Sequence, residues 1–259
     1  MRVRAGCELT LVATSPQPLI AMLRPCSGLG QWIVEEKYEF EPFVKATEYV
    51  DCFGNLCQRL VAPVGNLRLR TQVTVEVADE IAVKPGAPLT AVADLPDYAL
   101  QFLLPSRYCP SDTLESFAQQ VAGSHTPGYD QVEAIRSWIR ENIEYKYGVS
   151  NGSTNAADSL RDKAGVCRDF SHIGLTLCRA LRIPARMVVG YLYRLDPMDL
   201  HAWFEAFVDG RWYTFDATQA EPLGGRIAIA YGRDAADVAL ITEFGPLETK
   251  DMRVWVDRL

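Results

Sequence analysis

The spacing of apolar residues changes along this chain from a period of two to a helical period, and this change restricts the fold more than any other feature. Between residues 67 and 77, polar side chains alternate with a second set that shares one face: Leu67, Leu69, Thr71, Val73, Val75 and Val77. This alternation is typical of a half-buried strand. Further short apolar runs, at residues 47–50 and 56–62, flank the turn-forming segment 51–55. We therefore expect an N-terminal part built of β-strands.

After Pro110 the apolar residues recur at helical spacing in residues 111–122, 130–143 and 167–181. Three strand-like segments follow at 186–194, 201–208 and 211–216. A proline-punctuated segment, residues 88–110, separates the two patterns. The sequence thus predicts an α+β fold with a β-rich, β-sandwich-like domain at residues 1–105 and a second domain at residues 106–259.

Composition limits the classes of partner. Lys and Arg number 26 and Asp and Glu number 33, so the net charge is −7, which argues against a nucleic-acid binder or a protein attracted to membranes by basic charge. No apolar run has the length of a signal-peptide core or of a membrane span of about 18 residues. We expect a cytoplasmic protein with no nucleic-acid and no membrane partner, while assembly into a homo-oligomer stays open.

The chain has seven cysteines and three histidines. An odd number of cysteines excludes a complete intramolecular disulfide framework, and reduced thiols fit a cytosolic protein. Cys52 and Cys57 flank a turn, but a single pair at this spacing is a weak indication of zinc. We therefore predict no metal and no cofactor, and ask whether any cysteine is a nucleophile.

Cys167 stands out because it follows a glycine-containing loop and opens a long apolar helical segment. The free amides and the dipole at a helix N-terminus favour a thiolate, and the same amides can stabilise an oxyanion. The alternative is a small buried residue at a helix start. Position alone does not decide between the two interpretations.

A predicted hairpin brings His201 and Asp216 together. Asp209-Gly210 between two aromatic-rich segments is a strong signal for a two-residue turn. That turn pairs residues 208 and 211, which places His201 and Asp216 on one face as diagonal neighbours, roughly 7–8 Å apart at the backbone. An aspartate beside an imidazole fixes its tautomer and stabilises the imidazolium. The alternative is a surface histidine and an aspartate at a strand end, and a three-residue loop would break the pairing.

These segments resemble the transglutaminase-like superfamily, and in particular bacterial members proposed to be cysteine proteases. The resemblance rests on four stretches: Gly165-Val166-Cys167-Arg168-Asp169, then Ile183-Pro184-Ala185-Arg186, then His201-Ala202-Trp203, then Asp216-Ala217-Thr218. It implies a papain-like catalytic domain in which a nucleophile helix packs on an antiparallel sheet. By matching position, it implies Cys167 as nucleophile, His201 as general base and acid, and Asp216 as orienting partner.

The resemblance leaves the reaction open, because the superfamily contains proteases, amidases, transamidases and members without activity. We expect a thiol enzyme that acts on a peptide or other amide through an acyl-enzyme, and favour hydrolysis because no sequence feature indicates an acceptor-amine site. Alternatives are a transamidase, a non-catalytic scaffold, and a zinc site formed by the same three side chains. Among the other candidates we expect a structural hydrogen bond for His172, core packing for Cys178, and a solvated position for His125.

Overall fold

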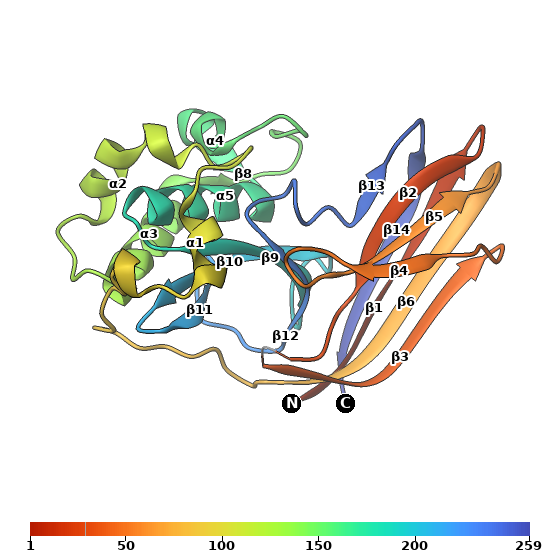
Figure 1. Ribbon diagram of the computed structural model, residues 1–259, viewed down its shortest axis with the longest axis horizontal. Helices are drawn as coiled ribbons and strands as arrows, with labels where there is room; N and C mark the ends of the chain where they lie inside the picture. Colours follow the sequence, from red (N-terminus) through yellow and green to blue (C-terminus); the bar gives the residue numbers. More distant parts are fainter. Residues whose placement is uncertain (29) are drawn as a thin grey trace.

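The computed structural model describes residues 1–28 and 30–259, and in this part of the chain the strands form three four-stranded antiparallel sheets and one two-stranded sheet. Two of the large sheets form the layers at one end of the molecule, and the third lies with the helices at the other end (Figure 1). The predicted α+β fold, with a β-sandwich-like part followed by a helix packed on an antiparallel sheet, is confirmed.

The sandwich contains eight strands: β1 (Arg2–Ala13), β2 (Gln17–Arg24), β3 (Gln31–Glu41), β4 (Thr47–Val50), β5 (Leu56–Ala62), β6 (Gly65–Val77), β13 (Ile241–Glu243) and β14 (Glu248–Arg258). One sheet has the order β14-β1-β6-β3 and the other β13-β2-β5-β4. The alternation predicted for β6 is confirmed, because the side chains at 67, 69, 71, 73, 75 and 77 are all buried. They pack with the apolar faces of the neighbouring strands into one core.

The last strands of the chain return to the N-terminal sheets. β14 pairs antiparallel with β1, with Val3 opposite Arg258 and Leu9 opposite Met252, and β13 pairs with β2. The two termini therefore lie close together (Figure 1). The division at residue 105 stays a prediction, but residues 241–258 form part of the sandwich rather than of the sheet that carries His201.

The remaining elements lie between β6 and β13. The helices are α1 (Asp97–Leu100), α2 (Glu115–Ala122), α3 (Tyr129–Asn142), α4 (Ala156–Asp162) and α5 (Cys167–Ala180), with 3₁₀ turns at Val92–Asp94, Gln101–Leu103 and Ser111–Thr113. The strands are β7 (Glu144–Tyr145), β8 (Ala164–Gly165), β9 (Ala185–Leu192), β10 (His201–Val208), β11 (Arg211–Phe215) and β12 (Arg226–Gly232). The four longer strands form a sheet of order β11-β10-β9-β12.

Helix α5 is the central helix of this part, because α2, α3 and α4 surround it and it packs on β10 and β9. Its close approach to the sheet depends on Gly174. A methyl group at this position would lie 2.5 Å from the ring of Phe204 on β10, which is far inside van der Waals contact. The helix is therefore held tightly against the sheet, and its first residue is fixed relative to the first residue of β10.

Among the described residues, no helix has the length and apolar character needed to cross a lipid bilayer. The cytoplasmic location stays a prediction.

Candidate active site

Cys167 is the first residue of α5, as the sequence predicts, and its side chain is partly exposed. The helix start is anchored by Asp169, which is fully buried and whose Oδ2 accepts a hydrogen bond of 2.9 Å from the amide of Val166. Gly165 makes this possible, because a Cβ there would lie 2.5 Å from the Cβ of Asp169. The side chain of Arg168 neutralises the Asp169 carboxylate at 3.0 Å. The loop geometry thus fixes the thiol at the helix N-terminus.

The hairpin of β10 and β11 has the predicted register. Val208 lies opposite Arg211 and Phe204 opposite Phe215, with the turn between them formed by residues 209 and 210. His201 therefore shares a face with Asp216, and its Nε2 lies 2.7 Å from Oδ2 of Asp216. Both side chains are buried, at 2% and 5% exposure. The structure confirms that these two residues form a hydrogen-bonded pair.

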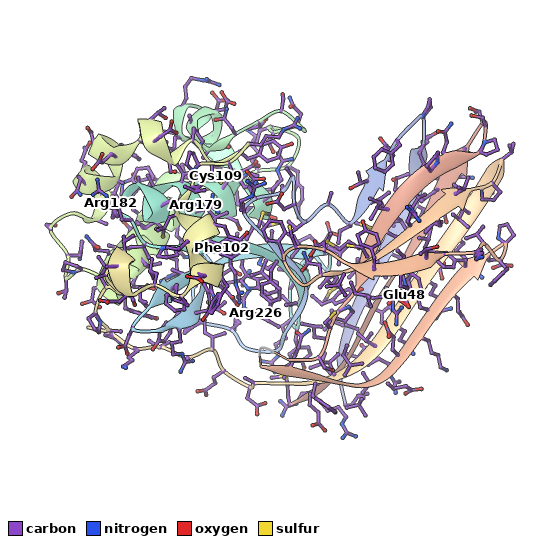
Figure 2. The ribbon with its side chains drawn as sticks, in the orientation of Figure 1. Glu48, Phe102, Cys109, Arg179, Arg182 and Arg226 are labelled. Carbon is purple, nitrogen blue, oxygen red and sulfur yellow. The ribbon has the colours of Figure 1, made fainter. Side chains whose placement is uncertain are left out.

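A third side chain, which the sequence analysis did not identify, completes the surroundings of Asp216. This residue is Arg226, the first residue of β12, which is labelled in Figure 2. Its Nη2 donates to Oδ2 of Asp216 at 2.8 Å. Its guanidinium lies 5.0 Å from the centre of the Trp203 ring. The other carboxylate oxygen, Oδ1, accepts from the amide and the hydroxyl of Thr218 at 3.0 and 2.7 Å. Both oxygens of Asp216 are thus hydrogen-bonded.

The charges of this cluster determine its protonation. Burial alone would raise the pKa of Asp216, but Arg226 and His201 hold that pKa well below its usual range. Burial alone would lower the pKa of His201, but the Asp216 carboxylate more than offsets this effect and, together with the nearby Cys167 thiol, raises the pKa to about 9. The arrangement therefore favours an imidazolium beside an ionised carboxylate at neutral pH.

Cys167 and His201 open into one pocket of about 240 Å³. Because Nε2 of His201 is bonded to Asp216 and Nδ1 has no hydrogen-bond partner in the described chain, Nδ1 is the nitrogen left to exchange a proton with the thiol. Tyr145 lines the same pocket, since β7 pairs in parallel with β8 directly before Cys167. Burial and the neighbouring Cys167 raise the pKa of the Tyr145 phenol well above its ordinary value, so that the phenol stays protonated.

Other sequence candidates have structural positions. His172 is fully buried and stacks on Tyr108, and its Nε2 accepts from the amide of Ala235 at 3.2 Å. Burial lowers the pKa of His172 to about 3, so this ring stays neutral and serves as the expected structural hydrogen-bond partner. Cys178 is buried in the core and His125 is exposed, both as predicted.

All seven cysteines are free thiols. Within the described ranges, no group of three or more histidine, cysteine, aspartate or glutamate side chains is arranged to hold a metal ion. Nothing in this geometry favours the zinc alternative over nucleophile chemistry at Cys167.

Comparison with known proteins agrees with this geometry. A family model of the transglutaminase-like superfamily matches residues 115–217. A solved structure of a proposed cysteine protease from Cytophaga hutchinsonii is 37% identical, covers 99% of this chain and 90% of that chain, and superimposes with a TM-score of 0.90. The chain belongs to the transglutaminase-like superfamily. Cys167, His201 and Asp216 all lie inside the segment that the superfamily model matches.

Similar proteins occur in mycobacteria. An uncharacterized protein of Mycobacterium leprae is 29% identical over 236 residues, which is 85% of this chain and 83% of the relative. An uncharacterized protein of Mycobacterium tuberculosis is 30% identical over 147 residues, and this match covers 50% of the present chain and 47% of that relative. The similarity to the first relative and to the Cytophaga structure therefore extends beyond the transglutaminase-like core into the β-sandwich.

Proposed function

We propose that this transglutaminase-like protein is a thiol hydrolase that cleaves peptide or other amide bonds through an acyl-enzyme, as a cysteine protease or amidase. The observation that carries the proposal is the buried 2.7 Å pair of His201 and Asp216, which opens into the same pocket as Cys167 at the start of α5. The similar Cytophaga protein, a proposed cysteine protease, supports the same reaction class.

The first half-reaction forms a thioester. At neutral pH His201 is already the imidazolium, so the Cys167 proton resides on Nδ1 and the thiolate sulfur attacks the carbonyl carbon of the substrate. The negative charge that develops on the carbonyl oxygen is stabilised by free amides at the start of α5. The carbon–nitrogen bond then breaks, and the amine leaves with the proton that His201 returns.

The second half-reaction releases the acid. His201 accepts a proton from a water molecule, the hydroxyl oxygen attacks the thioester carbon, and the carbon–sulfur bond breaks. The proton stays on Nδ1 and the sulfur leaves as the thiolate, which restores the starting ion pair. Throughout, Asp216 holds the Nε2–H of His201 and thereby keeps Nδ1 directed at the thiol.

The proposal is tested by comparing peptide-library turnover by wild type, Cys167→Ala and Cys26→Ser. Cys26 is exposed and lies outside the pocket, so its variant controls for loss of an unrelated thiol. We expect wild type and Cys26→Ser to cleave the same peptides, and Cys167→Ala to cleave none. Equal turnover by wild type and Cys167→Ala contradicts the proposal. Addition of a primary amine that diverts the product to an amide identifies a transamidase instead.

A further inference from the structure

Apart from His201, the charged side chains that line the pocket at Cys167 are all negative. Asp196 and Asp199, from the segment between β9 and β10, both line it, and none of its described lining residues is a lysine or arginine. Its other walls are aromatic, aliphatic or neutral polar side chains apart from His201. A substrate that reaches the thiol therefore passes two negative charges and meets no formal positive charge other than the protonated imidazole.

These two carboxylates differ from the other acidic groups near the site. Asp169 is neutralised by Arg168, and Asp216 by Arg226. Within the described residues, neither Asp196 nor Asp199 forms an ion pair, although Oδ1 of Asp199 accepts from the amide of Leu200 at 2.7 Å. Their charge is thus available to a molecule in the pocket.

Two arginines close to the lining in sequence or contact are engaged elsewhere. Arg140 donates to the carbonyl oxygen of Thr218 at 2.9 Å, and the guanidinium of Arg194 lies 5.2 Å from the centre of the Tyr193 ring. Neither guanidinium forms an ion pair with the two aspartates among the described residues. The negative charge of the pocket rim is therefore not cancelled by a direct partner.

The aromatic wall adds a second feature that suits a cation. Tyr145 and Tyr147 line the pocket, with their rings 5.6 Å apart in an edge-to-face arrangement. Both side chains are partly exposed, at 43% and 59%. The face of a tyrosine ring attracts a guanidinium or ammonium group within about 6 Å. The same pocket is lined by His201, whose buried Nδ1 has no hydrogen-bond partner among the described residues and is left to the reacting groups.

We propose that this pocket selects a substrate with a cationic side chain, lysine or arginine, next to the carbonyl that Cys167 attacks. Asp196 and Asp199 supply the charge that recognises it, and Tyr145 and Tyr147 supply the aromatic surface along which its apolar stem lies. The inference rests on the proposed function for the attacked carbonyl, but the charge at the thiol is measurable without any turnover.

The first test measures this charge with methanethiosulfonate reagents of opposite sign. The Cys167 thiolate attacks the reagent sulfur, a mixed disulfide forms and a sulfinate leaves, so that labelling needs no amide substrate. We expect the ratio of rates for the aminoethyl (cationic) and sulfonatoethyl (anionic) reagents to exceed the ratio for 2-mercaptoethanol by about tenfold, since two partly exposed carboxylates each contribute up to several-fold.

The variants make this measurement specific to the rim. The double variant Asp196→Asn/Asp199→Asn is expected to lose about tenfold in the rate ratio, whereas Asp94→Asn, which removes an exposed charge outside the pocket, leaves it unchanged. Higher salt is expected to lower the wild-type ratio toward that of the double variant. A ratio that is the same in wild type and in the double variant overturns the proposal.

The second test uses three matched peptide amides that differ only in the residue supplying the carbonyl: arginine, norleucine or glutamate. Arginine is chosen because its guanidinium does not act as an acceptor amine. We expect wild type to prefer arginine in kcat/KM, and the double variant to lose about tenfold in the ratio of kcat/KM for arginine to kcat/KM for norleucine. Cleavage without this preference overturns the proposal and leaves the function standing. The expected reagent ratio with no cleavage above Cys167→Ala overturns the function and leaves the charge selectivity standing.

Discussion

Replacing Asp216 by asparagine removes the charge that holds His201 protonated while keeping the size of the side chain and one acceptor oxygen. In the wild type the pKa of His201 is raised from 6.5 to about 9, a difference of about 2.5 pH units, or about 3 kcal/mol in favour of the imidazolium at 1.36 kcal/mol per unit. Without the carboxylate, burial of the ring dominates, and the remaining cation, Arg226, also disfavours a second positive charge. We therefore expect the pKa of His201 to fall to 6.5 or below.

The assay is an NMR titration of histidine labelled with ¹³C at the ε carbon. The chain has three histidines, so three resonances are expected. His172 stays neutral over the whole range because burial lowers its pKa to about 3. The His201 resonance, assigned from its loss in His201→Gln, is expected to titrate near pH 9 in wild type and at least 2 pH units lower in Asp216→Asn. A midpoint that is the same in both proteins refutes the electrostatic argument.

The same shift affects stability. A folded-state pKa above the unfolded value stabilises the fold fully below about pH 6.5, and this contribution is lost as pH rises through about 9. The lowered pKa of Asp216 acts in the opposite direction and at acid pH only, since its contribution is lost as pH falls through that low value. Between pH 6 and pH 10, the unfolding free energy of wild type should therefore fall by about 3 kcal/mol more than that of Asp216→Asn. Parallel pH profiles of urea denaturation would contradict this.

Three further predictions concern the surroundings of the site. Arg226→Leu leaves the buried Asp216 carboxylate without its guanidinium partner and should lower the unfolding free energy by about 3 kcal/mol in urea denaturation; an unchanged midpoint would show that the ion pair contributes nothing. Gly174→Val forces a side chain into the ring of Phe204 and should lower the unfolding free energy by about 1–3 kcal/mol in the same assay. An unfolding free energy equal to that of wild type would contradict this. Iodoacetamide should label Cys167 well below pH 8 and faster than it labels 2-mercaptoethanol. Equal rates would contradict the claim that the helix N-terminus activates this thiol.

The parts of the site that local sequence patterns encode were predictable. The Asp-Gly turn determines the register of β10 and β11 through chain connectivity alone, so the parity of the hairpin placed His201 and Asp216 on one face. The glycine-containing loop and the apolar periodicity likewise predicted the start of α5 at Cys167. What no pattern provided was the approach of the thiol to the imidazole, because it depends on the packing of α5 against the sheet.

Long-range pairing accounts for the features that the sequence did not reveal. β14 lies beside β1, more than 200 residues away along the chain, and no local signal distinguishes this partner from other alternating segments. Arg226 begins β12, the edge strand opposite β11, and reaches Asp216 after the irregular segment 217–225. An arginine at the beginning of a strand is ordinary in sequence, and only the fold gives it a buried carboxylate as partner.

The central claim, that Cys167 forms an acyl-enzyme with the help of His201 and Asp216, is tested most directly by rapid-quench reaction with p-nitrophenyl acetate followed by peptide mass mapping. The account predicts a burst of one equivalent of p-nitrophenolate, an acetyl group on the peptide that contains Cys167, and its decay at the steady-state rate. Asp216→Asn should slow both phases, and Cys167→Ala should show no burst. A burst that persists in Cys167→Ala, or acetylation distributed over the exposed cysteines without preference for Cys167, would contradict the account.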